Sequence, residues 1–197
     1  MGALLVAGVA AATDFPLSGT LSVNGNSGAL PDGGTFAGSS YDGLTGVIGA
    51  GAFTFPQGTI STDSPLGPIV VTYVLSQTDT STGMVAADGV AALTTASIRL
   101  LIVSVSTILG PLDIGTCELE PIDIDLSGPA DASGLDLADA GFTIPEVASS
   151  DCGGYGDEIN TAVAGNDTAI EVLMSGDFTP PAGNDTIFAN GFELPAG

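Results

Sequence analysis

Short runs of alternating apolar and polar residues, each closed by turn-forming residues, dominate this sequence. The run from Phe15 to Val23 alternates apolar with small or polar residues, and Asn24-Gly25 ends it. A period of two residues is typical of strands with one buried face, and Asn-Gly is a strong hairpin signal. Helical periodicity is absent from every long segment. The chain is therefore predicted to be all-β.

Similar runs recur at short intervals along the chain. They cover residues 44–55, 69–75, 85–107 (broken near Asp88-Gly89), 122–126, 135–137, 142–144 and 168–174, with a hairpin loop expected at 77–83 and one helical turn at 156–164. Eight or more short strands at this spacing favour an antiparallel β-sandwich or jelly roll, and a flattened β-barrel is the alternative. We place the β-sandwich domain at residues 13–176 and a Pro-rich linker with a C-terminal tail at 177–197.

The charged residues are almost all acidic, with 23 carboxylates against one cation, Arg99, and neither lysine nor histidine. Nucleic acid and anionic membrane surfaces are excluded as partners, because binding to either needs a basic footprint. What remains is self-repulsion, which keeps the chain soluble and which salt or bound cations relieve. Arg99 is expected to pair with a nearby acid or to face solvent.

Most common catalytic devices need residue types that this chain lacks. Without histidine there is no Ser-His or Cys-His nucleophile, and without lysine there is no Schiff base and no P-loop. Two carboxylates could still form a glycosidase pair, but the chain has no tryptophan and three tyrosines to stack on a sugar. We predict no catalytic residue, and we expect that the protein is not an enzyme.

The run at 122–126 places its acids, Asp123 and Asp125, on one strand face and its apolar residues on the other. Together with Asp136 on a later turn they are candidate Ca²⁺ ligands, because Ca²⁺ takes several carboxylate and carbonyl oxygens. The competing interpretation is a solvated strand face whose like charges block edge pairing. Two cysteines without histidine make a poor zinc site, and no organic cofactor is predicted.

The first twelve residues are small and apolar and end in Ala10-Ala11-Ala12, which fits a signal-peptide cleavage site before Thr13. No basic residue precedes them, so a second interpretation stays open. In it, residues 1–12 are a retained apolar assembly strand that the open sheet of a neighbouring copy accepts. The larger side chains of that strand are Leu4, Leu5, Val6 and Val9.

Export bears on the two cysteines. Cys117 and Cys152 are an even count in a chain with export features, so they are predicted to form one disulfide.

The second half of the chain contains, in order, the segments CELEPIDIDLSG (117–128), FTIP (142–145), CGG (152–154) and IN (159–160). This pattern resembles a group of small exported bacterial β-proteins, common in actinobacteria, whose role is uncharacterised. The segment DTIFANGFE (185–193) is similar to tails that close many exported proteobacterial proteins. Both resemblances imply export and the first also implies the disulfide, while neither implies an activity or a functional residue.

These observations favour a non-enzymatic structural or assembly protein of the cell surface or extracellular space, in one form a filament subunit joined by β-strand exchange. Its partners would be further copies of itself or matrix and surface proteins. The alternative is a Ca²⁺-assisted adhesin or carbohydrate-binding module that uses the polar loops at 33–42 and 76–83.

Overall fold

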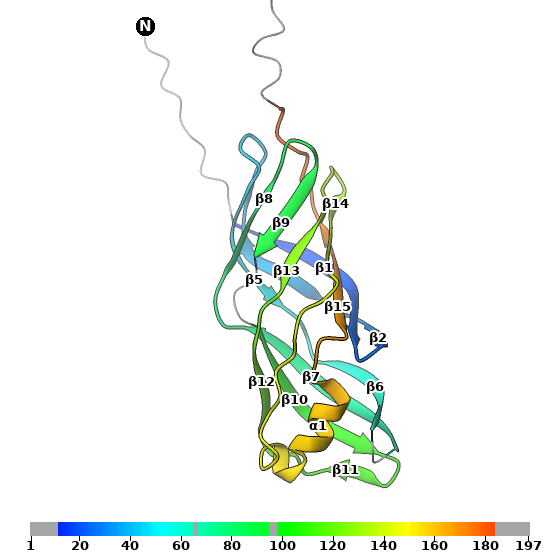
Figure 1. Ribbon diagram of the computed structural model, residues 1–197. Coiled ribbons are helices and arrows are strands. Elements are labelled where there is room, and N and C mark those ends of the chain that lie inside the picture. Colours follow the sequence, from blue (N-terminus) through cyan, green and yellow to red (C-terminus); the bar gives the residue numbers. More distant parts are fainter. Residues whose placement is uncertain (1–11, 65–66, 95–97, 184–197) are drawn as a thin grey trace, which may run out of the picture.

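The computed structural model describes residues 12–64, 67–94 and 98–183, which are almost entirely antiparallel β-structure (Figure 1). The all-β prediction is therefore confirmed. The helical elements are a short 3-10 helix, η1 (Cys152–Gly154), and an α-helix, α1 (Gly156–Val163), at the site predicted for a helical turn. The strands are β1 Thr13–Val23, β2 Asn26–Ala29, β3 Gly34–Ser39, β4 Tyr41–Asp42, β5 Val47–Thr54, β6 Gly58–Ser64, β7 Gly67–Gln77, β8 Ser81–Val85, β9 Val90–Thr94, β10 Ile98–Thr107, β11 Gly110–Leu112, β12 Cys117–Ile122, β13 Asp125–Pro129, β14 Gly134–Asp139 and β15 Thr168–Ser175.

Eight of these strands form a closed antiparallel barrel, in the upper part of Figure 1. Their hydrogen-bonded order is β5-β3-β1-β15-β14-β13-β9-β8, and β8 pairs with β5 to complete the ring. The predicted β-sandwich is therefore wrong, and the barrel alternative describes the fold. Both architectures use strands with one buried face, so alternation alone does not separate them. The pairing of β5 with β8 does.

Glycines let neighbouring barrel strands approach closely. A Cβ atom at Gly19 would lie 1.9 Å from the backbone oxygen of Glu171 in β15, and one at Gly128 would lie 1.9 Å from the backbone oxygen of Asp136 in β14. No other residue type avoids these clashes without moving the backbone. Glycines of this kind mark tight bends in barrel strands.

A polar side chain supports the seam at which the barrel closes. Gln77, at the end of β7, accepts a hydrogen bond from the backbone N–H of Phe53 in β5 at 2.7 Å. Its side-chain amide also donates to the hydroxyl of Ser81 in β8 at 2.6 Å. Ser81 is buried, so this amide satisfies a hydroxyl that water does not reach. The two strands that complete the ring are thus both tied to the end of β7.

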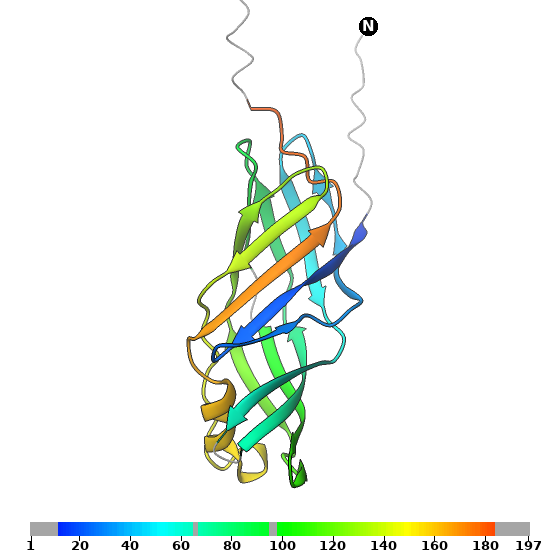
Figure 2. The same cartoon turned by 90° about the vertical axis from the view of Figure 1, so that its right-hand side faces the viewer.

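Below the barrel the sheet continues into a second group of strands. β7 meets β5 where Ser76 pairs with Thr54, and it then pairs with β6 and β10, while β10 also pairs with β11 and β12. Figure 1 places α1 and η1 at this end, and Figure 2 shows β6 and β7 beneath the β14–β15–β1 side of the barrel. Among the described helices none is long and apolar enough to cross a membrane.

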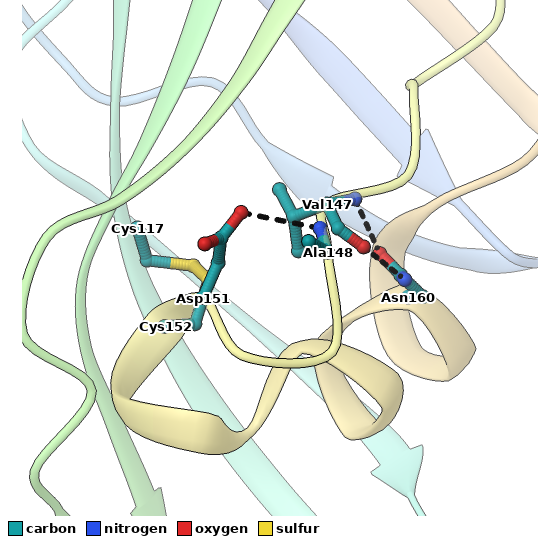
Figure 3. The surroundings of a disulfide bond; sticks show 6 residues. All are labelled: Cys117, Val147, Ala148, Asp151, Cys152 and Asn160. Carbon is teal, nitrogen blue, oxygen red and sulfur yellow. Dashed lines mark hydrogen bonds between the residues drawn. A yellow bond between two sulfur atoms is a disulfide. The ribbon is translucent and has the colours of Figure 1, made fainter.

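The predicted disulfide is present and joins β12 to the helical segment. Cys117 begins β12, Cys152 begins η1, and their Cα atoms are 4.5 Å apart. Nearby, the side chain of Asn160 in α1 donates to the carbonyl of Val147 at 2.8 Å and accepts from its N–H at 2.9 Å (Figure 3). Together these bonds hold the loop before η1, and α1 itself, at the end of the second strand group.

The buried faces of the strands share one continuous core. The run at 122–126 shows the predicted alternation, because its Ile and Leu side chains are buried while Asp123 and Asp125 are exposed. It is divided between two strands, since β12 ends at Ile122 and β13 begins at Asp125. Burial of the apolar side chains supplies the main driving force for this fold.

The core also includes residues beyond position 176. Phe178 is fully buried, and its ring centroid lies 4.9 Å from that of Phe15 and 5.2 Å from that of Tyr41. The backbone N–H of Phe178 donates to the carbonyl of Asp131 at 3.0 Å. The Tyr41 hydroxyl donates to the carbonyl of Thr179 at 2.6 Å. The segment that follows β15 is therefore part of the barrel packing.

Two local expectations are wrong. Residues 77–83 do not form a hairpin loop, because β8 pairs with β5 and β9 and not with β7. The run at 142–144 forms an isolated bridge between Ile144 and Gly165 in place of a strand, and the following Pro145 has no N–H with which to extend a ladder. The turn at Asn24-Gly25 does join two paired strands, β1 and β2, with φ values of 48° and 74°.

Candidate interaction surface

Charge is distributed very unevenly along the chain and over the strands. Residues 43–112 hold three of the 23 carboxylates, whereas residues 113–177 hold fifteen. Strands β5, β7, β8, β9 and β10 contain no carboxylate and a single cation, Arg99. These five strands are contiguous in the sheet, and acidic strands border them, β13 beside β9 and β12 beside β10. We call their outward-facing side chains, with the turns at 43–46 and 108–109, the neutral face.

The neutral face also carries most of the exposed apolar surface. Nine large hydrophobic side chains are exposed among the described residues, and eight of them lie on this face. The exception is Leu173 in β15. The eight are Leu44, Val47, Val70, Met84, Val90, Val103, Ile108 and Leu109. Scattered exposed hydrophobics are common on soluble proteins, but apolar enrichment together with loss of charge is typical of interaction surfaces.

On the barrel, the strand register brings the apolar side chains of the neutral face together. Val47 in β5 lies directly opposite Met84 in β8, and Met84 lies opposite Ala92 in β9. The adjoining turn presents Leu44, which is 91% exposed. Asp42 holds this turn by accepting hydrogen bonds from the Thr45 hydroxyl at 2.7 Å and the Leu44 N–H at 3.0 Å. These bonds lower the pKa of the Asp42 carboxyl. The hydrogen bond to the Leu44 N–H also fixes the backbone from which the Leu44 side chain projects.

In the second strand group, a β-bulge interrupts the alternation of β10 beside an exposed apolar side chain. Ile102 pairs with Tyr73 and Ser104 pairs with the adjacent Thr72, so Val103 is the extra residue in β10. Its side chain is 44% exposed, close to the 43% of Val70 in β7. Ile102 and Val105 are both buried, so the bulge places two residues, Val103 and Ser104, between successive inward-facing positions.

The neutral face ends in an apolar turn at the tip of the β10–β11 hairpin. Ile108 is 78% exposed and Leu109 is 94% exposed. The Thr107 hydroxyl donates to the carbonyl of Gly110 at 3.0 Å and accepts from the Leu109 N–H at 3.0 Å. The turn is thus hydrogen-bonded internally while both apolar side chains project from it.

Arg99 lies at the border between the neutral face and β12. Its guanidinium is 3.5 Å from the Glu118 carboxylate and donates to the Ser76 hydroxyl at 3.2 Å. Both partners of the ion pair are 36% exposed, so the pair contributes at most about 1 kcal/mol. The expectation that Arg99 pairs with an acid is confirmed, and the cation gives the neutral face no strong field.

The structure does not bring the three candidate calcium ligands together. Asp125 begins β13, and Asp136 in β14 packs its backbone against Gly128, three residues further along β13. At about 3.3 Å per residue that separation is roughly 10 Å. Within the described ranges no group of three or more His, Cys, Asp or Glu side chains could hold a metal ion. Asp123 lines a different groove from Asp136, and a role for Ca²⁺ stays a prediction.

Unlike the neutral face, both of these grooves are lined by carboxylates. One, of about 370 Å³, is lined by Asp131 and Asp136 with residues of β14 and β15. The other, of about 360 Å³, is lined by Asp123 with Phe142 and Thr143. The Asp131 carboxylate is occupied by its own turn, because it accepts from the N–H of Ser133 at 2.6 Å and from its hydroxyl at 2.5 Å. These bonds lower the pKa of Asp131.

Other sequence-predicted features are placed as follows. Leu4, Leu5, Val6 and Val9 of the expected assembly strand lie outside the described residues. The expected recognition loop at 33–42 is mostly strand, since it contains β3 and β4, and the loop at 76–83 is reduced to residues 78–80 between β7 and β8. The neutral face itself was not predicted, although one signal was present: the scarcity of acids in residues 43–112.

Comparisons of the chain with protein-family models, with curated proteins and with solved structures found no match.

Proposed function

We propose that this chain is a non-enzymatic structural protein of the cell exterior that works by protein–protein contact through the neutral face. The observation that carries the proposal is the segregation of the surface. Eight of nine exposed large hydrophobic side chains lie on strands and turns that hold almost none of the 23 carboxylates. Water-exposed apolar surface is unfavourable in a protein that works alone, and contact with a partner removes it.

The chemistry of the chain supports a role without catalysis. The chain has no histidine or lysine, and the buried polar side chains are engaged in structural hydrogen bonds. Ser39 donates to the carbonyl of Gly49 at 2.7 Å, Ser81 accepts from Gln77, and Thr168 donates to the carbonyl of Phe142. Among the described residues, no buried side-chain nitrogen or oxygen lacks a partner. Each of these buried polar side chains therefore has a hydrogen-bonding partner within the protein.

Export is supported by the disulfide between Cys117 and Cys152, because such bonds persist in oxidising compartments. The large negative charge supports a different part of the proposal, because mutual repulsion between carboxylates keeps copies of the chain soluble until a specific contact forms.

Packing through a face explains the surface better than strand exchange does. Each of the eight barrel strands is paired on both sides. Among the described strands outside the ring, β2, β4, β6, β11 and β12 each pair with one strand, and the longest apolar-rich edge among them carries charge: β12 contains Glu118, Glu120 and Pro121. Charged residues and proline are the features with which proteins block edge pairing. Strand exchange with residues 2–12 stays a prediction for that segment.

Oxidative footprinting of Met84 tests the proposed function. Met84 is 55% exposed at the centre of the barrel part of the neutral face, whereas Met174 is buried and serves as an internal reference. The protein is exposed to hydroxyl radicals in its native extracellular setting and, separately, as purified monomer, and sulfoxide formation is measured by mass spectrometry. We expect at least fivefold protection of Met84 in the native setting, with Met174 unreactive in both. Equal reactivity of Met84 in the two samples would refute the proposal.

A further inference from the structure

We propose that the partner of the neutral face is a second copy of this chain, in a symmetric contact that strengthens as salt increases. This inference rests on the proposed function and adds to it the identity of the partner. A symmetric pair uses the same surface patch on both copies.

The charge distribution leaves few surfaces on which two copies can meet. Each copy has a formal charge of −22, and contact through β12, β13, β14 or β15 would press carboxylates against carboxylates. The neutral face is different, because its strands hold no carboxylate at all. When two copies pack with these faces together, the carboxylates of β14 and β15 lie away from the contact, and those of β12 and β13 lie at its rim. Strands β2, β3 and β11 hold no carboxylate either, but eight of the nine exposed large hydrophobic side chains among the described residues lie on the neutral face. Low repulsion and apolar contact therefore favour this face together.

The area of the neutral face is sufficient for a reversible dimer. The five strands have 8, 11, 5, 5 and 10 residues. At a strand spacing of about 4.8 Å and a rise of about 3.3 Å per residue they cover roughly 620 Å². Two copies would then bury about 1,200 Å², above the roughly 1,000 Å² that specific interfaces need. Val103, beside the bulge in β10, and the paired Val47 and Met84 place apolar side chains in both parts of this area.

The response to salt follows from the border of the face. Glu118 and Asp125 stand on the flanking strands, so the rims of two packed copies bring like charges near each other. The Debye length is about 10 Å at 0.1 M salt and about 3 Å at 1 M, so added salt removes this repulsion and leaves the apolar contact intact. A contact between the neutral face and a basic partner would respond in the opposite direction, because salt screens attraction too.

Sedimentation velocity on the purified protein tests the proposal, with EDTA in every buffer so that calcium plays no part. We expect the dissociation constant of the dimer to fall at least tenfold between 0.05 M and 1 M NaCl. Met84→Glu and Val103→Glu each place a carboxylate in the neutral face, one in each strand group, and each should weaken the dimer at 1 M NaCl more than tenfold. Leu173→Glu is the matched control, because Leu173 is 43% exposed but lies outside the face, and it should change the constant less than twofold.

Three results would overturn the proposal: a monomer at every salt concentration up to 2 M, a dimer that weakens as salt rises, or equal loss of the dimer in all three variants. Circular dichroism of each variant shows whether it is folded, and substitution at these exposed positions leaves the core unchanged. Protection of Met84 in the native setting combined with a purified monomer at every salt concentration would overturn the self-contact and leave the proposed function standing. Reactive Met84 in the native setting would overturn the proposed function itself.

Discussion

Replacing Phe178 with alanine should destabilise the whole barrel, although the residue follows the last strand. The side chain is fully buried and packs between Phe15 and Tyr41, with ring centroids 4.9 Å and 5.2 Å away. Removing a buried phenylalanine ring costs about 3–5 kcal/mol, from lost burial and from the cavity left behind. Against a total stability of roughly 5–15 kcal/mol, we expect a loss of about 4 kcal/mol and a melting temperature lower by on the order of 10 °C.

Urea unfolding followed by circular dichroism measures this loss. Leu173→Ala is the control, since Leu173 is 43% exposed on the neighbouring strand and should change the free energy of unfolding by less than about 0.5 kcal/mol. A chain truncated after Asp177 should lose as much stability as Phe178→Ala does. If both the substitution and the truncation cost less than about 1 kcal/mol, Phe178 is not part of the core and the domain ends near residue 176.

Three further predictions concern stability. Replacing Cys117 and Cys152 with alanine should lower the free energy of unfolding by about 4 kcal/mol, because the disulfide closes a loop with a sequence separation of 35. Chemical reduction of the unmutated protein should lower it by the same amount in urea unfolding. An unchanged urea midpoint would contradict this prediction. Gln77→Ala should lower the free energy of unfolding by about 2–3 kcal/mol, because it breaks two hydrogen bonds at the barrel seam. Gln77→Glu keeps the acceptor for the Phe53 N–H and should lower it less. Equal losses in the two variants would contradict the role of Gln77 at the seam. Hydrogen bonds lower the pKa of Asp131, so its stabilisation is present above the unfolded value of about 3.9 and is lost as pH falls through the lower folded value. Asp131→Ala should therefore reduce the melting temperature more at pH 7 than at pH 2, and a reduction of equal size at both pH values would contradict this.

The elements of this fold were largely predictable, and their assembly was not. Alternation in β1 and β15 and the turn at Asn24-Gly25 are local signals, because side chains two residues apart share a strand face. The hairpin expected at 77–83 failed because strands adjacent in sequence are not always adjacent in the sheet, and Gln77 instead bridges β5 and β8. Closure of the ring depends on backbone hydrogen bonds between β5 and β8, which any residue type except proline can make.

The candidate site likewise combines features that the sequence predicts with features that depend on the tertiary structure. The candidate calcium ligands were predicted because Asp123 and Asp125 share a strand face and Asp136 was expected on a later turn, yet strand geometry keeps the three from forming one site. The neutral face joins residues that are far apart in sequence, such as Val47 and Met84. Its charge depletion could be read from residues 43–112, but its continuity could not, since that depends on the order of strands in the sheet.

The sequence by itself determined the class of structure, the disulfide, the side of each strand that is buried, and the absence of the residue types on which most catalysis relies. Each of these follows from local periodicity or from the residues available, which a linear chain displays directly. Only the tertiary structure decided that the sheet closes into a barrel, that Phe178 completes its core, and that the weakly charged strands lie side by side. The physical reason is that these features arise from contacts between segments that are distant in the sequence. The packing of the whole core determines which of those contacts form, and no single segment specifies them.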